Sequence, residues 1–296
     1  MDSSSGSGGV GAPGRPAPEP LSYTAFPDGP GGGNPAGVVL DARGLSAADR
    51  VSTAARLGYS ETAFVEATGT PGRFRVRYAS PRAEVSFCGH ATIATAVALA
   101  ERDGPGELVF ETLAGAIPVL TRATPDGITA TLTSVPTRTR PAERGEVDAT
   151  LAALGWARSD LDPRYPPHVA FAGEHHLVLA VHSRDRLAAL DHDMAALQAL
   201  TAERGWITVH LVWSRSPTEF DARDPFPAGG VVEDPATGAA AAAFGVYLRA
   251  LDLVRLPARV TIRQGQDMGR PSLLLVDLAV DDDRVRVTGT AAAQAS

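Results

Sequence analysis

The sequence predicts an α/β (α+β) protein built from two similar halves that face each other across a single site. The first observation is that a strand-like run, a proline, a loop and a glycine-started, alanine-rich helix occur in this order twice in the 296 residues. The second is that each helix is followed by a strand, a glycine turn and another strand. Such a repeat indicates duplication of one unit. A chain of this length can bury a core in each unit.

Each copy of the repeat can be followed along the chain. The first comprises the strand 74–78, the loop 84–88, Gly89 with a helix expected from Ala91 to about Glu101, and the strand pair 110–119. The second comprises the strand 219–223, the loop 233–237, a helix expected from about Thr237 to Arg249, and the strand pair 262–273. Gly89 and Gly238 leave backbone N–H groups bare at two helix N-termini. Two such termini that converge would bind a carboxylate.

The chain begins with a stretch that offers almost nothing to bury. Residues 1–20 are mostly Ser, Gly and Pro, and we expect a disordered tail outside the fold. A first strand at 21–26 leads into the glycine cluster 31–37 and the strand 38–40. No helix follows these glycines, as a dinucleotide fingerprint would require. We therefore expect a turn, whose freed backbone N–H groups could also line a site.

A helix and an extended segment come next. Helical spacing predicts a helix over 45–57, with Ser46 as its N-cap and Gly58 at its end. The following segment, 59–66, is expected to be extended. Alternation along it places Glu61 on the same face as small apolar side chains, which is unusual for a carboxylate.

The second half is expected to follow a linking region. Residues 135–167 are rich in proline and charge around one helix at 147–154, and the clear elements beyond are strands at 175–181 and 209–213, a helix at 194–204 and a last strand at 284–288. These elements predict a tail at 1–20, an N-terminal half at 21–135 and a C-terminal half at 136–283. The strand at 284–290 could pair back with the N-terminal half.

Charge and residue usage argue against several classes of protein. The 34 acidic residues outnumber the 27 basic ones and give a net charge of −7, which argues against nucleic acid or an anionic membrane as partners. All basic residues are arginine, and without lysine there is no Schiff base, pyridoxal phosphate aldimine or P-loop. No segment approaches the ~18 apolar residues of a membrane span, and no signal peptide is evident. A cytoplasmic protein is expected.

Thiol and metal chemistry have few candidate residues. Cys88 is the single cysteine, which excludes an intrachain disulfide, a thiol pair and a cysteine-based zinc site. The histidines at 168, 175, 176, 182, 192 and 210 lack compact ligand spacing, so no metal is expected and most should be surface or strand-end residues. Cys88 lies near a helix start, where a thiol can become a reactive thiolate. A buried, inert thiol is at least as consistent with the sequence.

Two polar residues lie beside the glycine-started helices. His90 could simply pack, but the positive helix end would lower its pKa and hold the imidazole neutral, ready to donate or accept a hydrogen bond. Asp234 precedes Pro235 and a helix, so from the sequence alone we favour an N-cap with proline in the first turn. A serine hydrolase is not indicated, because the chain has no GxSxG elbow.

Five motifs that occur together and in this order make the chain resemble a known family. They are Gly33 to Leu40, Ser60 to Val65, Cys88 to Thr92, Glu233 to Gly238, and Gln264-Gly265 with Met268 to Ser272. From about Ser22 to Thr288 the chain resembles the PhzF family of phenazine-biosynthesis-type isomerases. The resemblance implies the related diaminopimelate epimerase-like fold, a pair of similar α/β domains with the active site between them.

The resemblance also implies roles for individual residues. Glu61 stands where the family has its acid/base glutamate. His90 and Asp234 stand where it has side chains that assist proton transfer and hold the substrate. No cofactor is implied. Members of the family are often homodimers, so a homodimer is expected.

Substrate contacts follow from the same motifs. Gly89 and Gly238 stand where backbone groups contact the substrate, and Cys88 lies beside them. The family usually has a serine where this chain has Ala239. The hydroxyl contact of that serine is missing, so the substrate could differ from the dihydro-hydroxyanthranilate of phenazine enzymes.

Two classes of function are therefore kept. The first is a cofactor-independent isomerase, expected in secondary metabolism, that moves a proton on a small unsaturated carboxylic or amino acid, with Glu61 removing and returning it. The second is a protein that kept the fold and pocket and became a non-catalytic binding partner in a pathway. Within the enzyme class, an amino-acid epimerase or racemase is the competitor. A two-thiol racemase needs two cysteines, and this chain has one.

Overall fold

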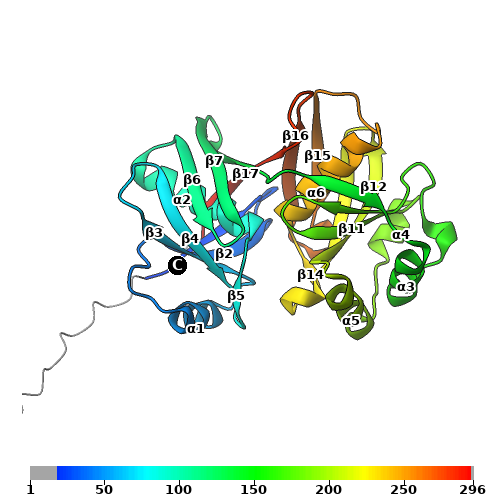
Figure 1. The fold of residues 1–296 in the computed structure, drawn as a ribbon, viewed down its shortest axis with the longest axis horizontal. Coiled ribbons are helices and arrows are strands. Elements are labelled where there is room, and N and C mark those ends of the chain that lie inside the picture. The colour runs from blue at the N-terminus through cyan, green and yellow to red at the C-terminus, as the bar shows by residue number, and fades with distance from the viewer. Residues whose placement is uncertain (1–18, 295–296) are drawn as a thin grey trace, which may run out of the picture.

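The computed structural model describes residues 19–294, and its elements form two groups that lie side by side (Figure 1). The predicted tail at 1–20 lies outside the described residues apart from Glu19 and Pro20. We call β1–β8 with α1 and α2 the first group, and β9–β16 with α3–α6 the second group.

The strands and helices of the first group follow the chain in order. They are β1 Leu21–Ala25, β2 Asn34–Val39, α1 Ala47–Leu57, β3 Thr62–Ala67, β4 Arg73–Ala79, β5 Glu84–Val85, α2 Gly89–Asp103, β6 Glu107–Thr112, β7 Gly115–Thr124 and β8 Gly127–Thr133. The helix α1 has the predicted ends, since Ser46 caps it and Gly58 closes it in the left-handed conformation.

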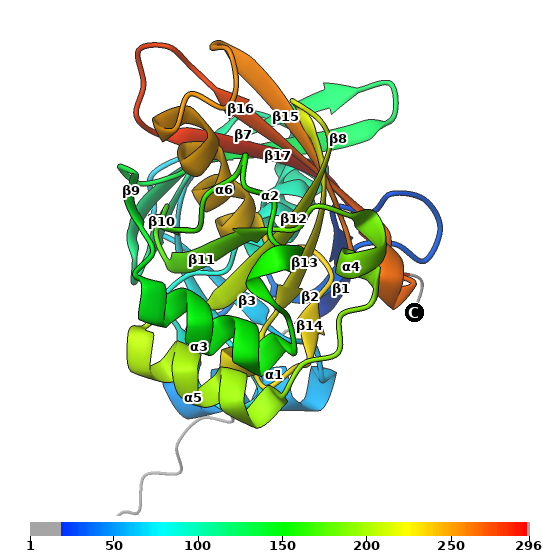
Figure 2. The same cartoon turned by 90° about the vertical axis from the view of Figure 1, so that its right-hand side faces the viewer.

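The second group is larger. It contains β9 Arg138–Pro141, α3 Arg144–Leu154, β10 His168–Phe171, β11 His175–Ala180, α4 Arg184–Ala188, α5 Met194–Arg204, β12 Thr208–Ser216, β13 Glu219–Pro225, β14 Glu233–Asp234, α6 Gly238–Ala250, β15 Ala258–Gln264 and β16 Ser272–Leu278. Short 3-10 turns lie at Arg158–Asp160, Pro227–Gly229 and Gln266–Met268. The helices α3 and α5 lie side by side (Figure 2) and pack against the face of β10–β12 that is opposite α6.

The same order of connections occurs in both groups. In the first, β5 pairs antiparallel with β4, α2 follows, and β6 returns parallel to β4. In the second, β14 pairs antiparallel with β13, α6 follows, and β15 returns parallel to β13. Antiparallel pairs β6–β7 and β15–β16 complete the two units. The repeat seen in the sequence is therefore also a repeat of backbone topology.

The last strand, β17 Val285–Ala293, joins the two groups. It pairs antiparallel with β16 of the second group and with β8 and β1 of the first. In Figure 1 it crosses between the groups in red. The two repeated units are therefore held in one continuous hydrogen-bonded network.

The helices α2 and α6 form the centre of the core. All residues of α2 from Gly89 to Ala100 are buried, and α6 is buried from Ala240 to Leu248. Burial all around explains why both helices are so rich in alanine, since small side chains let strands approach from every side. Alternation in β3 agrees with the prediction, because Ala63 packs in the core around α2 whereas Phe64 packs under α1.

Several elements differ from the sequence-based expectation. The region 135–167 was expected to hold one helix, but it also contains the strand β9, whose exposed arginines and terminal proline hide its strand character. The strands β8 and β10 and the short helix α4 were not predicted. His176 and His210 are buried within β11 and β12, which are covered on both faces, so these two of the six histidines differ from the expectation for most of them. His168 is buried as well, but it lies at a strand end, where it starts β10.

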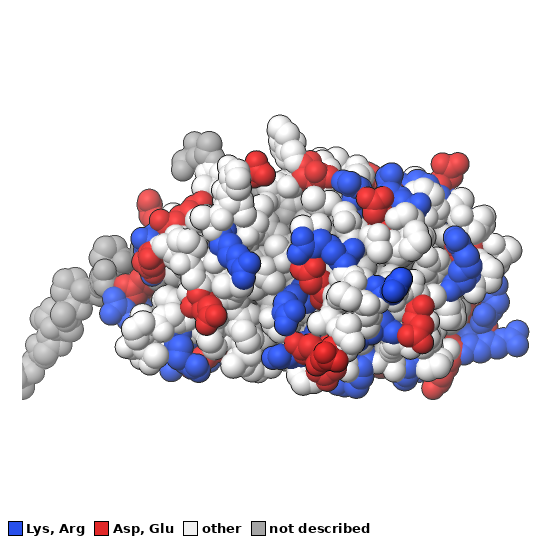
Figure 3. Space-filling model, turned by 90° about the horizontal axis from the view of Figure 1, so that it is seen from above, with Lys and Arg blue, Asp and Glu red and all other residues white. Residues whose placement is uncertain are grey.

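The described surface carries mixed charge. Figure 3 shows arginine and acidic side chains interspersed over one face of the molecule. Of the described helices, none combines the length and the apolar content that crossing a bilayer requires.

Candidate active site

One pocket brings together all the residues that the sequence singled out. It has a volume of about 340 Å³ and is lined from the first group by Glu61, Cys88, Gly89 and His90, and from the second by Asp234, Gly238 and Ala239. The remaining lining residues are Val85, Ser86, Phe87, Glu174, Ile207, Phe226 and Thr237. A volume of this size suits a small organic molecule.

The two glycine-started helices meet at this pocket. A Cβ atom placed on Gly89 would lie 3.3 Å from the backbone nitrogen of Ala239, in the first turn of α6. The side chains of the N-cap residues, Cys88 and Thr237, accept no hydrogen bond from a backbone N–H of the helix that each precedes. The first-turn N–H groups of both helices are therefore not satisfied by capping side chains, and both positive helix ends favour a negatively charged ligand.

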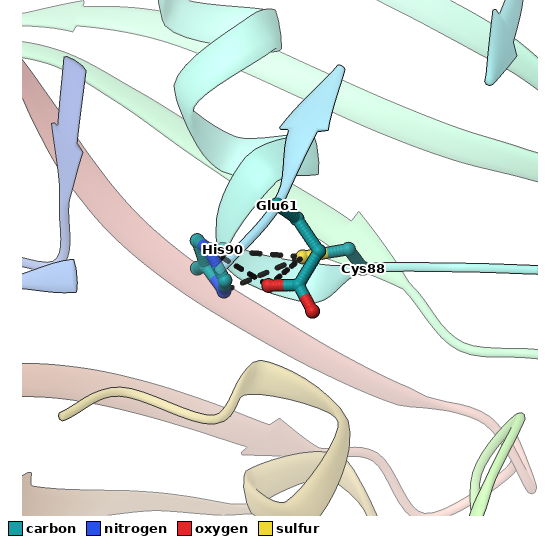
Figure 4. A group of neighbouring side chains, drawn as sticks. All are labelled: Glu61, Cys88 and His90. Atoms are coloured by element: carbon teal, nitrogen blue, oxygen red, sulfur yellow. Dashed lines mark hydrogen bonds and ion pairs between the residues drawn. The ribbon is translucent and has the colours of Figure 1, made fainter. Parts of the chain in front are cut away.

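Glu61, Cys88 and His90 form a compact cluster at the start of α2 (Figure 4). Glu61 precedes β3 and is only 5% exposed, on the apolar face predicted for it. Its Oε2 lies 3.5 Å from Nε2 of His90 and 3.7 Å from Sγ of Cys88, which donates. Sγ also lies 3.3 Å from Nδ1 of His90, and the Ser60 hydroxyl lies 3.4 Å from Nε2.

Burial sets the protonation of the two residues beside Glu61. Burial lowers the pKa of His90, and the opposing charge of Glu61 only partly offsets this, so the imidazole is neutral. The direction agrees with the prediction, but the main cause is desolvation and not the helix end. Burial and then the charge of Glu61 raise the pKa of Cys88 well above its ordinary value. The thiol is therefore protonated, and the reactive-thiolate alternative is not supported.

Asp234 corrects a prediction, because it is not the N-cap of α6. It lies on β14, and the N-cap is Thr237, whose hydroxyl donates to Oδ2 of Asp234 at 2.7 Å. The chain stays non-helical through Pro235 and Ala236, and the helix begins at Gly238. This leaves the Asp234 carboxyl facing the pocket and free of its expected capping role.

The Asp234 carboxyl is held by donors and is hard to ionise. The Asn34 side-chain amide donates to its Oδ1 at 2.7 Å. Burial first and the charge of Glu61 second raise the pKa of Asp234 well above its usual range, although the hydrogen bonds from Thr237 and Asn34 oppose the shift. The surroundings of Asp234 therefore favour its protonated form.

Two supporting residues were missed by the sequence-based assignment. Asn34 also donates to the carbonyl of Ala236 at 3.1 Å, across from one group to the other. Gln264 is fully buried, donates to the backbone carbonyl of Asp234 at 2.7 Å and accepts from the N–H of Thr237 at 3.1 Å. Both residues belong to the five motifs, so the sequence did mark the segments that carry them. A single sequence does not show that their side chains reach Asp234.

The cluster of Glu61, Cys88 and His90 also has the composition of a metal site. One ligand atom from each lies within 4.8 Å of the others. In the structure these three side chains contact one another as a hydrogen-bonded cluster, in which the Cys88 thiol donates a hydrogen bond to Glu61.

Comparison with known proteins gives a consistent result. A family model described as phenazine biosynthesis-like protein, PhzC-PhzF, matches residues 23–296. An uncharacterized isomerase from Deinococcus radiodurans is 36% identical over 282 residues, covering 91% of this chain and 91% of that protein. The trans-2,3-dihydro-3-hydroxyanthranilate isomerase of Pseudomonas chlororaphis is 31% identical over 268 residues, covering 90% and 93%.

Solved structures show the same fold. A PhzF-family phenazine biosynthesis protein from Bacillus anthracis matches with a TM-score of 0.82 at 25% identity, covering 93% of this chain and 96% of that one. A hydroxyproline epimerase from Agrobacterium vitis, 13% identical, matches with a TM-score of 0.63 over 93% and 90%. The mixed α/β fold is therefore one shared with both PhzF proteins and amino-acid epimerases.

Proposed function

The chain belongs to the PhzC-PhzF family of phenazine biosynthesis-like proteins and is an isomerase, and we propose that it shifts a proton on a small unsaturated carboxylic or amino acid without a cofactor. In this proposal Glu61 is the acid/base group, and the pocket between α2 and α6 is the active site. The two groups of elements are two similar domains, and the substrate lies in the cleft between them.

The observation that carries the proposal is the pairing of two buried carboxyl groups in one pocket. Glu61 lies among neutral partners, since His90 is uncharged and the Cys88 thiol is protonated. Asp234 on the other side of the pocket has a raised pKa, and its surroundings favour the protonated form. A carboxyl group that is hard to ionise can donate a hydrogen bond to the substrate while a second carboxyl group in the same pocket acts as the base.

The hydrogen bonds around Asp234 direct its proton toward the pocket. Gln264 donates to the Thr237 hydroxyl at 3.0 Å, so that hydroxyl donates to Asp234, and Asn34 donates as well. Both fixed partners are therefore donors. Among the hydrogen bonds of the described residues no acceptor takes the Asp234 proton, so it is available to a substrate oxygen or nitrogen.

The proposed step balances with these groups. The Glu61 carboxylate removes a proton from a tetrahedral carbon, and the C–H electron pair moves into conjugation with the neighbouring double bond and the substrate carboxylate. The bare N–H groups at the starts of α2 and α6 stabilise the negative charge that develops. Glu61 then returns the proton to a different carbon, the double bond is displaced, and the enzyme is unchanged.

The pocket lining supports a substrate with an apolar body. Val85, Phe87, Ile207 and Phe226 supply apolar surface, and among the described lining residues there is no arginine. A substrate carboxylate would then rest on the helix ends. Ala239 adds no hydroxyl, so we propose a substrate related to dihydro-hydroxyanthranilate but lacking the group that the family serine contacts.

Proton exchange at carbon tests the proposal. Wild-type protein incubated in deuterated water with trans-2,3-dihydro-3-hydroxyanthranilate, or with a related unsaturated amino acid, should place deuterium on carbon as it isomerises the compound. A protein that binds such compounds and exchanges no carbon-bound proton would instead be a non-catalytic binding partner.

A further inference from the structure

A second buried polar cluster lies next to the site but outside the pocket. It consists of His176 on β11, Thr208 and His210 on β12, and Asp224 on β13, and all four are 0% exposed. None of them lines the pocket. Four polar residues removed from water are costly to a fold unless they are fully paired, and the proposed reaction does not use them.

The hydrogen bonds of this cluster all run toward Asp224. The Thr208 hydroxyl donates to Oδ1 of Asp224 at 2.8 Å, and its oxygen lies 2.8 Å from Nδ1 of His176. A hydroxyl has one proton, so His176 supplies the N–H of that second bond. Burial lowers the pKa of His176 to about 3, so this histidine is neutral with its proton on Nδ1.

His210 completes the arrangement. Its Nδ1 lies 2.9 Å from Oδ2 of Asp224, and its ring packs against Phe244 of α6. The Nε2 atoms of both His176 and His210 are buried without a partner. Asp224 therefore accepts from two sides, as an ionised carboxylate does. The unpaired nitrogens show that the cluster is not optimised for stability.

Asp224 stands directly across the strand pair from Asp234. The two residues are partners in the antiparallel register of β13 and β14. Directly opposed residues project from the same face, with Cβ atoms about 4.5–5.5 Å apart. The neighbouring Arg223 projects from the other face, where it binds Glu233. No cation of this strand pair therefore separates the Asp224 charge from Asp234.

We propose that Asp224, which accepts from His210 and Thr208 and stands opposite Asp234 in the β13–β14 pair, is a positioning residue that favours the hydrogen-bond-donating form of Asp234 toward the substrate. The inference rests on the proposed function of Asp234. Burial and the charge of Glu61 are larger causes of the raised pKa of Asp234, and the charge of Asp224 adds to them.

The titratable and hydrogen-bonding groups around Asp234 and Asp224 are the following. Around Asp234 they are Glu61, Cys88 and His90 in the pocket and the donors Asn34, Thr237 and Gln264. Around Asp224 they are His176, Thr208 and His210. Replacing Asp224 by asparagine keeps the size of the side chain, removes the charge and exchanges one acceptor oxygen for an NH2 donor.

Carbon-13 NMR of aspartate carboxyl groups tests the proposal without turnover. The Asp234 signal is assigned by its loss in Asp234→Asn, and its titration midpoint is compared in wild type and Asp224→Asn. We expect the midpoint to fall by roughly one pH unit, as expected for loss of one like charge a few ångströms away. The matched control is Asp221→Asn, a buried aspartate of the same strand that is bound to Arg184 and Arg215. It should leave the midpoint in place.

An unchanged midpoint in Asp224→Asn, or an equal shift in both variants, overturns the inference. If Asp224→Asn does not fold, Thr208→Val replaces it. Loss of the hydroxyl removes one of the donors to Asp224, so the Asp234 midpoint should shift in the same direction by less.

The alkaline limb of the pH profile of kcat/KM should move with the NMR midpoint of Asp234, whereas a merely structural role of Asp224 would lower activity equally at every pH. Failure of proton exchange in wild type would remove the proposed function without moving these midpoints.

Discussion

Gly89 and Gly238 bring the first turns of α2 and α6 into contact, since a Cβ on Gly89 would lie 3.2 Å from the Cα of Gly238. The two residues are the corresponding positions of the repeated unit. Their contact is what places two helix N-termini at one pocket. At Gly89 glycine is favoured by this close approach of backbones and not by an unusual φ, whereas a Cβ on Gly238 would meet ordinary contacts at 3.5 Å or more.

The first prediction follows from this contact. Gly89→Ala should lower the free energy of unfolding by about 1–3 kcal/mol, because backbone atoms of α6 cannot move aside as a flexible side chain would. Turnover should fall as well, since the helix ends would separate. Urea unfolding measures the first effect. Gly145→Ala in α3, where a Cβ meets nothing within 4 Å, is the control and should be neutral or slightly stabilising. Equal stability of both variants would contradict the close contact.

The second prediction concerns the donor that bridges the two groups. Asn34→Ala removes the amide that donates to Asp234 and to the Ala236 carbonyl. We expect turnover to fall roughly 10- to 100-fold, because a carboxyl that loses its partner no longer holds one orientation. The hydrogen bond from Asn34 opposes the raised pKa of Asp234, so its removal should raise that pKa further. Unchanged steady-state kinetics in the variant would show that Asn34 does not position Asp234.

The third prediction concerns the single cysteine. Cys88→Ser should cause only a modest loss of activity, because the thiol is protonated and no second thiol exists to complete a two-base racemisation. Alkylation by iodoacetamide at neutral pH should be slow and should accelerate as the pH rises beyond the ordinary thiol range. Rapid inactivation by stoichiometric reagent, with protection by substrate, would indicate a catalytic thiolate instead.

The fourth prediction uses the linkage between pH and stability. Asp234 has a raised pKa when folded, so the folded protein binds a proton that the unfolded chain releases above about pH 4. This contribution reduces stability as the pH rises from the unfolded pKa toward the folded one, by roughly 1.4 kcal/mol per pH unit. Asp234→Asn cannot release that proton.

The comparison is made by urea unfolding at several pH values. Asp234→Asn should gain stability relative to wild type between pH 5 and 7, and the difference should shrink toward pH 4. Its activity should be strongly reduced, as expected where function and stability conflict. A difference that stays constant over this range would mean that Asp234 titrates normally in the folded protein.

The sequence predicted the repeated units because their signals are local. A glycine before an alanine-rich helix, or Ser46 and Gly58 at the ends of α1, can be recognised without knowing what packs nearby. The strand β9 was missed because its partner β10 lies about 30 residues away and its exposed arginines and terminal proline resemble a linker. The strand β10 was missed because its four residues are too few to show a pattern. Pattern alone cannot reveal such strands.

The same limit applies to the site. The residues that line the pocket were found because they lie in contiguous motifs at two helix starts. The N-cap assignment of Asp234 failed because the chain stays non-helical through Ala236 and the helix begins only at Gly238, so Thr237 occupies the N-cap position. The buried state of His176 and His210, and their contacts through Thr208 to Asp224, depend on sheet register and are invisible in a single sequence.

The central claim is that Glu61 moves the proton, and deuterium entry at carbon in Glu61→Gln tests it most directly. The glutamine keeps the shape and the hydrogen-bonding reach of the side chain but cannot take up a proton. The compound is the one that the wild type isomerises, either trans-2,3-dihydro-3-hydroxyanthranilate or a related unsaturated amino acid. In deuterated water, followed by NMR, we predict that exchange and isomerisation fall by roughly two to four orders of magnitude while the compound still binds. Glu174→Gln, the other glutamate of the pocket lining, should retain both activities. Exchange in Glu61→Gln as fast as in the wild type would contradict the account.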